Sequence, residues 1–183
     1  MSDFYHKYIK YKTKYLQIAG YKNNIELIRL KDITKDEINE LHTITQTKDI
    51  MNNIGSGETW DKKYINKLKE SDEIDYKSNN EEYYQYYIKD NNNNKNKIIG
   101  YISLRPLKNY DTLQVRIFVF ISGVGYGRDA LELLTKTYNK DILAVVSQDN
   151  IKSNKLFSKW VLLKDIIYYF GKKHNVYKYV CCK

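Results

Sequence analysis

The strongest constraint on the fold is a segment with three alternating glycines, Ser122-Gly-Val-Gly-Tyr-Gly127. It follows an apolar, β-branched run over residues 113–121 and precedes a helical pattern over residues 128–138, so it should join a strand to a helix. Glycines leave main-chain N–H groups uncovered, and a helix N-terminus adds partial positive charge, so the segment could bind phosphate oxygens. A tight turn also needs glycines for steric reasons alone, so the pattern by itself leaves both interpretations open.

A second strand-to-helix segment follows. Residues 141–147 predict a buried strand, and the chain continues with Asn150, Ser153, Leu156, Phe157 and Lys159. Together the two segments resemble the GCN5-related N-acetyltransferase (GNAT) superfamily. The glycine segment is similar to that family's pyrophosphate loop. The later segment is similar to its second signature, in which an Asn, a small residue and a Leu-aromatic-x-Lys group follow one another. The resemblance extends loosely over residues 25–180.

The sequence departs from the family pattern in three places. Ser122 stands where the family usually has Gln or Arg, and Val161 and Leu162 stand where it usually has Gly-Phe. Phe157 replaces a tyrosine that, in many members, protonates the departing coenzyme A thiolate. A phenylalanine has no proton to donate, so this role is absent, taken by another residue or left to solvent.

The hydrophobic pattern predicts one α/β domain, with a mixed sheet of about seven strands flanked by about four helices. Residues 1–22 form a basic, Tyr-rich extension, and residues 23–183 form the acetyltransferase domain. Thr34 should cap the first helix of the domain. The expected strands are 25–30, 83–89, 98–104, 113–120, 141–147, 165–170 and 176–180; the expected helices are 34–50, 59–69, 128–138 and one after Asn150, with a polar connection over residues 72–80.

Composition argues against several other classes of protein. The net charge is +9, but the lysines are scattered and no recognition motif accompanies them, so nucleic-acid binding is not expected. No apolar stretch reaches the ~20 residues needed to cross a bilayer, so no stable membrane insertion is expected. The adjacent Cys181 and Cys182 form no disulfide framework, which favours a reducing cytoplasm. Three isolated histidines suggest no metal site. The tyrosine- and lysine-rich start resembles the starts of many giant-virus proteins, which would imply host-cell cytoplasm.

The resemblance implies acetyl-coenzyme A as co-substrate and no metal. Its pyrophosphate would bind the glycine segment, and its pantetheine arm would run between the diverging strands at residues 113 and 141. Either Ile117 or Val119 would be the backbone anchor for the thioester. The implied cofactor-binding residues are Ile117, Phe118, Val119, Ser122, Gly123, Val124, Gly125, Tyr126, Gly127, Arg128, Asn150, Ser153 and Phe157.

Acetyl transfer needs a neutral amine, so a base must remove a proton. Asp111 stands where some histone-type members of the family carry a glutamate base, provided that Ile117 is the anchor. The alternative is that Asp111 is an ordinary turn aspartate. Tyr168 or Tyr169 could replace Phe157 as the proton donor to the thiolate.

The resemblance implies an acceptor site shaped by the loop of residues 55–61 and by the terminal hairpin. Glu58 and Asp61 flank Trp60, a combination that suits a cationic amine through charge pairing and cation–π contact. A helix cap and a core anchor would have the same residue types. We therefore keep a substrate-binding role for Glu58, Trp60 and Asp61 as an expectation, with the structural role as its alternative.

Two functions follow from these features. The first is an N-acetyltransferase that acts directly on a primary amine of a polyamine, an amino sugar, or a protein N-terminus or lysine. The second is a non-catalytic or degenerate acyl-coenzyme A-binding module, because Phe157 and Val161 depart from the family pattern. The expected partner is a small-molecule or peptide amine, and the expected assembly is a monomer or a homodimer.

Overall fold

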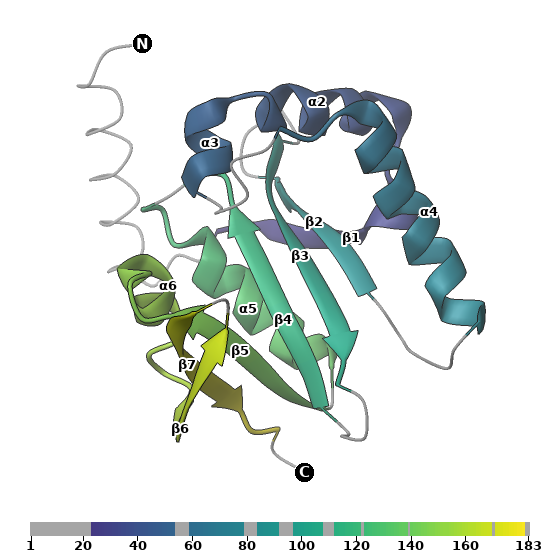
Figure 1. The fold of residues 1–183 in the computed structure, drawn as a ribbon. Helices are drawn as coiled ribbons and strands as arrows, with labels where there is room; N and C mark the ends of the chain where they lie inside the picture. Colours follow the sequence, from purple (N-terminus) through teal and green to yellow (C-terminus); the bar gives the residue numbers. More distant parts are fainter. Residues whose placement is uncertain are drawn as a thin grey trace.

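The computed structural model describes residues 23–53, 59–78, 84–91, 97–107, 112–121, 123–138, 140–169 and 171–181. These residues form a mixed seven-stranded sheet, five α-helices and one 3₁₀ turn (Figure 1). The elements are β1 (Ile25–Arg29), η1 (Leu30–Asp32), α2 (Lys35–Thr45), α3 (Lys48–Asn53), α4 (Lys62–Ser78), β2 (Tyr84–Asp90), β3 (Lys97–Pro106), β4 (Thr112–Val119), α5 (Tyr126–Thr137), β5 (Asp141–Ser147), α6 (Ile151–Leu156), β6 (Val161–Tyr169) and β7 (Lys172–Tyr179). The α/β fold expected from the sequence is confirmed.

The strand order is β1-β2-β3-β4-β5-β7-β6. All neighbouring strands pair antiparallel except β4 and β5, which are parallel. A parallel pair needs a crossover connection, and α5 provides it. In Figure 1, α5 lies behind the sheet, and α2, α3 and α4 lie at the top and right.

Each face of the sheet has its own hydrophobic cluster. The cluster on the α5 face contains Leu113, Ala130, Leu134 and Ala144, and the cluster on the opposite face contains Leu41, Met51, Ile65 and Tyr101. Side chains alternate along a strand. Accordingly, Ile117 and Val119 of β4 pack in the first cluster, and Phe118 and Phe120 pack in the second.

The predicted start of the first helix is confirmed, but its predicted end is wrong. Thr34 Oγ1 accepts from the backbone N–H of Glu37, and the Glu37 carboxylate accepts from Thr34 N, so the two form a capping box. The helix ends at Thr45 rather than Ile50, and a separate helix, α3, follows. The break falls in a run of β-branched residues, which disfavour helix. In this run Thr45 Oγ1 donates to backbone carbonyls, including that of Trp60.

The second predicted helix, residues 59–69, is also wrong in its bounds, because α4 runs from Lys62 to Ser78. Its later residues are polar and were therefore predicted to be a connection. Asp72 is nevertheless buried, and its carboxylate binds the guanidinium of Arg29. This ion pair joins the helix to β1. The hydrophobic pattern of the sequence does not predict it.

The terminal hairpin has longer strands and a tighter turn than predicted. Tyr169 pairs with Lys172, and Gly171 lies in the turn with φ of 71°. Residues 172–175, predicted to be a loop, belong to β7. Similarly, β3 continues through Pro106, which pairs with Leu113. The expected extension, residues 1–22, lies outside the described residues. No described helix is both long and apolar enough to span a bilayer.

Candidate acetyl-coenzyme A site

The centre of the site is a gap between β4 and β5. Their parallel pairing covers only Thr112–Gln114 against Asp141–Leu143. Beyond this point β4 continues to Val119 and β5 to Ser147, and the register between the two strands does not continue. Both strands therefore have edges along which an extended ligand could form hydrogen bonds.

The alternation of hydrogen bonds shows which residues of β4 face this gap. Phe120 N donates to Ile99 O and Leu107 N donates to Thr112 O, so the backbone groups of even-numbered residues point toward β3. In an extended strand, neighbouring residues point to opposite sides. The backbone groups of Ile117 and Val119 consequently point toward β5, and those of Phe118 point toward β3. Both anchors left open by the sequence thus face the gap.

The glycine segment connects β4 to α5 with a conformation that requires glycine. Gly123 and Gly125 both have φ of 87°, a region that L side chains rarely occupy. Gly125 is the N-cap of α5, and its carbonyl accepts from the N–H groups of Arg128 and Asp129. The first N–H groups of a helix have no acceptor within the helix and carry partial positive charge. They are therefore available for anionic oxygens.

Two side chains near one end of the antiparallel β1–β2 pair, one just before β1 and one at the end of β2, hold this segment in place. Asn23 Nδ2 donates to Asp129 Oδ2 (2.6 Å) and to the Val124 carbonyl (3.1 Å). The Tyr126 hydroxyl donates to Asp90 Oδ2 (2.6 Å). Burial and the hydrogen bond to Asp90 raise the pKa of Tyr126, so its hydroxyl remains a donor. The sequence analysis missed Asn23 and Asp90, because each is distant in sequence from its partner.

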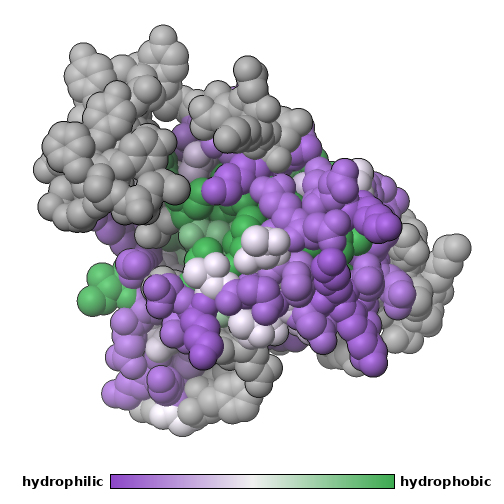
Figure 2. Space-filling model, turned by 90° about the horizontal axis from the view of Figure 1, so that it is seen from above, coloured by the Kyte–Doolittle hydropathy of each residue, from purple (hydrophilic) through white to green (hydrophobic). Residues whose placement is uncertain are grey.

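Three segments of the predicted site converge at Gly127. A Cβ atom built at Gly127 would lie 3.3 Å from Leu156 Cδ2 and 3.4 Å from Val119 Cγ2. The end of β4, the first turn of α5 and the last turn of α6 therefore meet so closely that a larger residue would require neighbouring side chains to shift. Figure 2 views the molecule from the end to which β4 points and shows a recessed apolar area (green) bordered by hydrophilic residues.

The short helix α6 is attached to the end of β5 through two asparagines. Asn150 Oδ1 accepts from Ser153 N (3.0 Å), so Asn150 caps α6. Asn154 was missed by the sequence analysis. Its Nδ2 donates to the carbonyls of Ser147 (2.9 Å) and Asn150 (2.8 Å), and its Oδ1 accepts from Tyr177 Oη (2.9 Å).

Phe157 lies in the apolar core next to α6. Its side chain is buried, with its ring 5.0 Å from that of Trp160 and 6.0 Å from that of Tyr177. The nearest phenol in this group is that of Tyr177, whose hydroxyl donates to Asn154. Phe157, which replaces the tyrosine of the family pattern, therefore supplies only an apolar surface.

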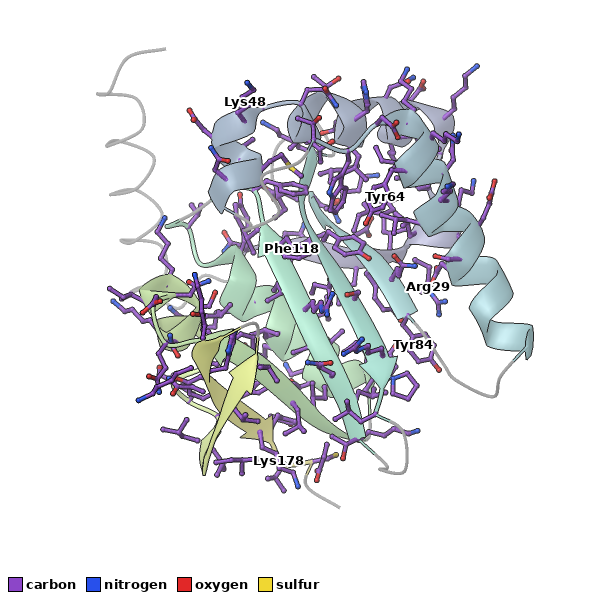
Figure 3. The ribbon with its side chains drawn as sticks, in the orientation of Figure 1. Arg29, Lys48, Tyr64, Tyr84, Phe118 and Lys178 are labelled. Atoms are coloured by element: carbon purple, nitrogen blue, oxygen red, sulfur yellow. The ribbon has the colours of Figure 1, made fainter. Side chains whose placement is uncertain are left out.

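Trp60 and Asp61 have structural roles. Asp61 Oδ1 accepts from Tyr64 N (2.6 Å) at the start of α4, and Trp60 is 8% exposed. Trp60 contacts both Tyr64 and Tyr101 edge to face, and Tyr101 stacks on Phe118. This aromatic row connects α4 to the edge of the gap; Figure 3 labels its two ends, Tyr64 and Phe118.

Several predicted site residues fall outside what the structure describes. Ser122, Glu58 and Asp111 lie outside the described residues, as does the side chain of Tyr168. Arg128 is exposed on the first turn of α5. Within the described part of the chain, no three His, Cys, Asp or Glu side chains gather as a metal site.

Comparison with known families identifies this arrangement. A family model described as an acetyltransferase (GNAT) domain matches residues 28–160. The chain belongs to the GNAT acetyltransferase family. The matched region contains the glycine segment, the gap and α6. No curated protein matches the chain.

Solved structures share the GNAT fold at low sequence identity. An acetyltransferase from Thermus thermophilus has a TM-score of 0.61 and 17% identity; the match covers 85% of this chain and 96% of the Thermus chain. A chimera of the spermidine N-acetyltransferase SpeG from Vibrio cholerae and hSSAT has a TM-score of 0.57 and 16% identity; the match covers 84% of this chain and 92% of the chimera. The Campylobacter jejuni N-acetyltransferase PseH in complex with acetyl coenzyme A has a TM-score of 0.53 and 16% identity, with coverages of 84% and 98%.

Proposed function

We propose that this protein transfers the acetyl group of acetyl-coenzyme A directly to a primary amine. The observation that carries the proposal is the gap between β4 and β5, which opens beside the glycine segment at the N-terminus of α5. The pyrophosphate would bind the N–H groups of Gly123 to Gly127. The pantetheine arm would lie in the gap, where the backbone groups of Ile117 and Val119 can donate and accept. A backbone N–H near the thioester would stabilise the oxyanion of the tetrahedral intermediate, an effect worth ~3 kcal/mol per donor in other enzymes.

The reaction also needs a base for the amine and an acid for the thiolate. Asp111 is the proposed base and Tyr168 the proposed acid, with thiolate protonation by solvent as the alternative. Phe157 supports a second candidate function, a module that binds acyl-coenzyme A without transferring the acyl group, because the buried ring has no proton to donate. A viral origin and a cytoplasmic location would suit either function.

Calorimetry with acetyl-coenzyme A tests the cofactor site. We would compare the wild type with Gly123→Glu, which places a carboxylate where the pyrophosphate should bind. Gly171→Glu is a matched control, because Gly171 also has a positive φ and a Cβ would contact nothing within 4 Å at either position. Both variants should lose similar stability from backbone strain, about 1–2 kcal/mol.

Only Gly123→Glu should weaken acetyl-coenzyme A binding, by about tenfold or more, equivalent to ~1.4 kcal/mol. Equal affinities of the two variants for acetyl-coenzyme A would show that the pyrophosphate does not bind this segment. A coupled assay for free coenzyme A over a panel of primary amines then separates the candidates. Turnover establishes the transferase, whereas tight binding with no turnover for any amine favours the binding module.

A further inference from the structure

Two arginines lie close together on the face of the sheet opposite α5. The β3–β4 register pairs Arg105 with Gln114 and Ser103 with Arg116, so the arginines are diagonal neighbours on one face. The Cβ atoms of diagonal neighbours in an antiparallel pair lie ~7–8 Å apart. Both side chains are exposed, and both guanidinium groups can therefore reach the same small ligand.

Neither arginine has a carboxylate partner among the described residues. Arg105 Nε donates to Gln114 Oε1 (2.8 Å), and Arg116 forms no ion pair or hydrogen bond through its side chain within the described ranges. By contrast, Arg29 binds Asp72 with two parallel hydrogen bonds. Like charges on neighbouring strands repel each other, so the uncompensated pair would be stabilised by an anion bound between the two side chains.

The position of Arg116 connects this pair to the proposed reaction. Arg116 immediately precedes Ile117, whose backbone faces the gap, and Phe118 is the next residue on the same face. On this face Gln85 is buried beneath α4, since its Nε2 donates to Leu68 O. Arg116 therefore lies between the part of the sheet that α4 covers and the gap. In Figure 1, no labelled helix passes in front of β3 and β4 on this face.

We propose that Arg105 and Arg116 bind an anionic group, a carboxylate or a phosphate, of the amine acceptor. This inference rests on the proposed function, because it concerns the acceptor of the same acyl transfer. The planar fork of an arginine suits two-point binding of carboxylate and phosphate oxygens. Binding the anionic group on this face would hold the amine beside the gap. A purely cationic amine such as a polyamine would be repelled there. Asp61, the expected partner of a cation, caps α4.

Matched acceptor pairs test the proposed specificity. We would measure kcat/KM for glucosamine 6-phosphate against glucosamine, and for tyrosine against tyramine, which lacks only the carboxylate. The first pair reports on phosphate and the second on carboxylate. The wild type should prefer the anionic member of at least one pair, and Arg116→Gln should reduce that preference about tenfold or more, as expected for a lost hydrogen bond between charged groups.

Lys136→Gln is the charge-matched control. Lys136 is on α5, across the sheet from Arg116, and its side chain is 66% exposed. This variant removes the same charge and should keep the wild-type preference. A wild type that prefers the neutral or cationic member of both pairs, or an Arg116→Gln variant that keeps the anionic preference, would overturn the proposal.

A binding experiment separates this proposal from the proposed function. Inorganic phosphate and malonate would be titrated into the protein without cofactor, while the ¹⁵Nε–¹H signals of the arginine side chains are recorded by NMR. The signals of Arg105 and Arg116 should shift and saturate with one of the two probes, and each signal is assigned by its loss in the corresponding Gln variant. Unshifted signals would refute the anion site. Failure of acetyl-coenzyme A to bind in calorimetry would refute the transferase. It would not change the result of the NMR titration, which uses the protein without cofactor.

Discussion

Asp72 binds more partners than any other described carboxylate at the joint between α4 and the sheet. Its side chain accepts from Arg29 Nε (3.1 Å) and Nη2 (2.8 Å), Lys31 N (3.1 Å) and Gln85 N (3.0 Å). The Asp72 side chain has no exposed surface. Because buried charges are costly unless paired, the stability of this joint depends on the complete set of hydrogen bonds.

Asp72→Ala should therefore destabilise the protein by about 3–5 kcal/mol, since it leaves the Arg29 guanidinium and two backbone N–H groups without their acceptor. Chemical unfolding in urea measures the difference. Lys136→Gln, which breaks an exposed pair within α5, should change the unfolding free energy by less than ~0.5 kcal/mol. Equal effects of the two variants would show that the buried ion pair contributes little.

At the residue scale, local roles could be predicted and distant ones could not. Thr34 was predicted as a cap from its neighbours alone, and a cap was kept as the alternative role for residues around Trp60, where Asp61 proved to be one. Asp72 was assigned to a polar connection, because its partner Arg29 is 43 residues away. The same reason explains why the arginine pair on β3 and β4 was missed: it depends on strand register, which the sequence pattern does not specify.

At the element scale, the short helix α6 depends on the side chain of Asn154 for its attachment to the sheet. A helix of six residues is too short to be stable alone, and its one cap is Asn150. The hydrogen bonds of Asn154 to Ser147, Asn150 and Tyr177 attach the helix to β5 and β7. Leu156, at the end of this helix, contacts the position of Gly127. We infer that the site depends on this attachment.

Asn154→Ala should increase amide hydrogen exchange over residues 151–160 and weaken acetyl-coenzyme A binding severalfold, because α6 loses its links to two strands. Hydrogen-exchange mass spectrometry and calorimetry measure the two effects. Asn150→Ala removes only the cap, which typically costs about 1 kcal/mol, and should have a smaller effect on residues 156–160. Unchanged exchange in Asn154→Ala would contradict the proposed role.

Strands were predicted better than helix ends. The strand at residues 141–147 was predicted with the bounds that the structure has, because a buried strand gives a continuous apolar run. Helix α4 extends beyond its apolar residues, so its polar second half gave no periodic signal. The hairpin of β6 and β7 was predicted too short for a similar reason: Lys172 to His174 are polar, yet their backbone groups pair with β6.

At the scale of the whole molecule, Glu37 links the helical layer to the sheet. Its Oε1 accepts from Lys89 Nζ on β2 (3.0 Å). Burial alone would raise the pKa of Glu37, but hydrogen bonds from Thr34, Lys89 and Tyr87 together lower the pKa to about 2, from an ordinary value of 4.5. A lowered pKa means that the ionised form stabilises the folded state.

The stabilisation by Glu37 should be complete above pH 4.5 and should be lost as the pH falls toward 2, because the unfolded chain takes up the proton first. We would measure the unfolding free energy in urea between about pH 6 and pH 2, the range that spans both pKa values. Over the acidic part of this range, the unfolding free energy of the wild type should fall more steeply than that of Glu37→Gln. The two slopes should differ by up to ~1.4 kcal/mol per pH unit, which corresponds to one proton taken up on unfolding. Parallel curves for the two proteins would show that Glu37 titrates normally in the folded state.

The short pairing between β4 and β5 also has a thermal consequence. Few backbone hydrogen bonds join the two parts of the sheet, so the junction depends on the apolar cluster that includes Val115, Ala130, Leu134, Ala144 and Val146. Attraction between apolar groups weakens on cooling. Among the boundaries between strands, this one should therefore be the most sensitive to cold.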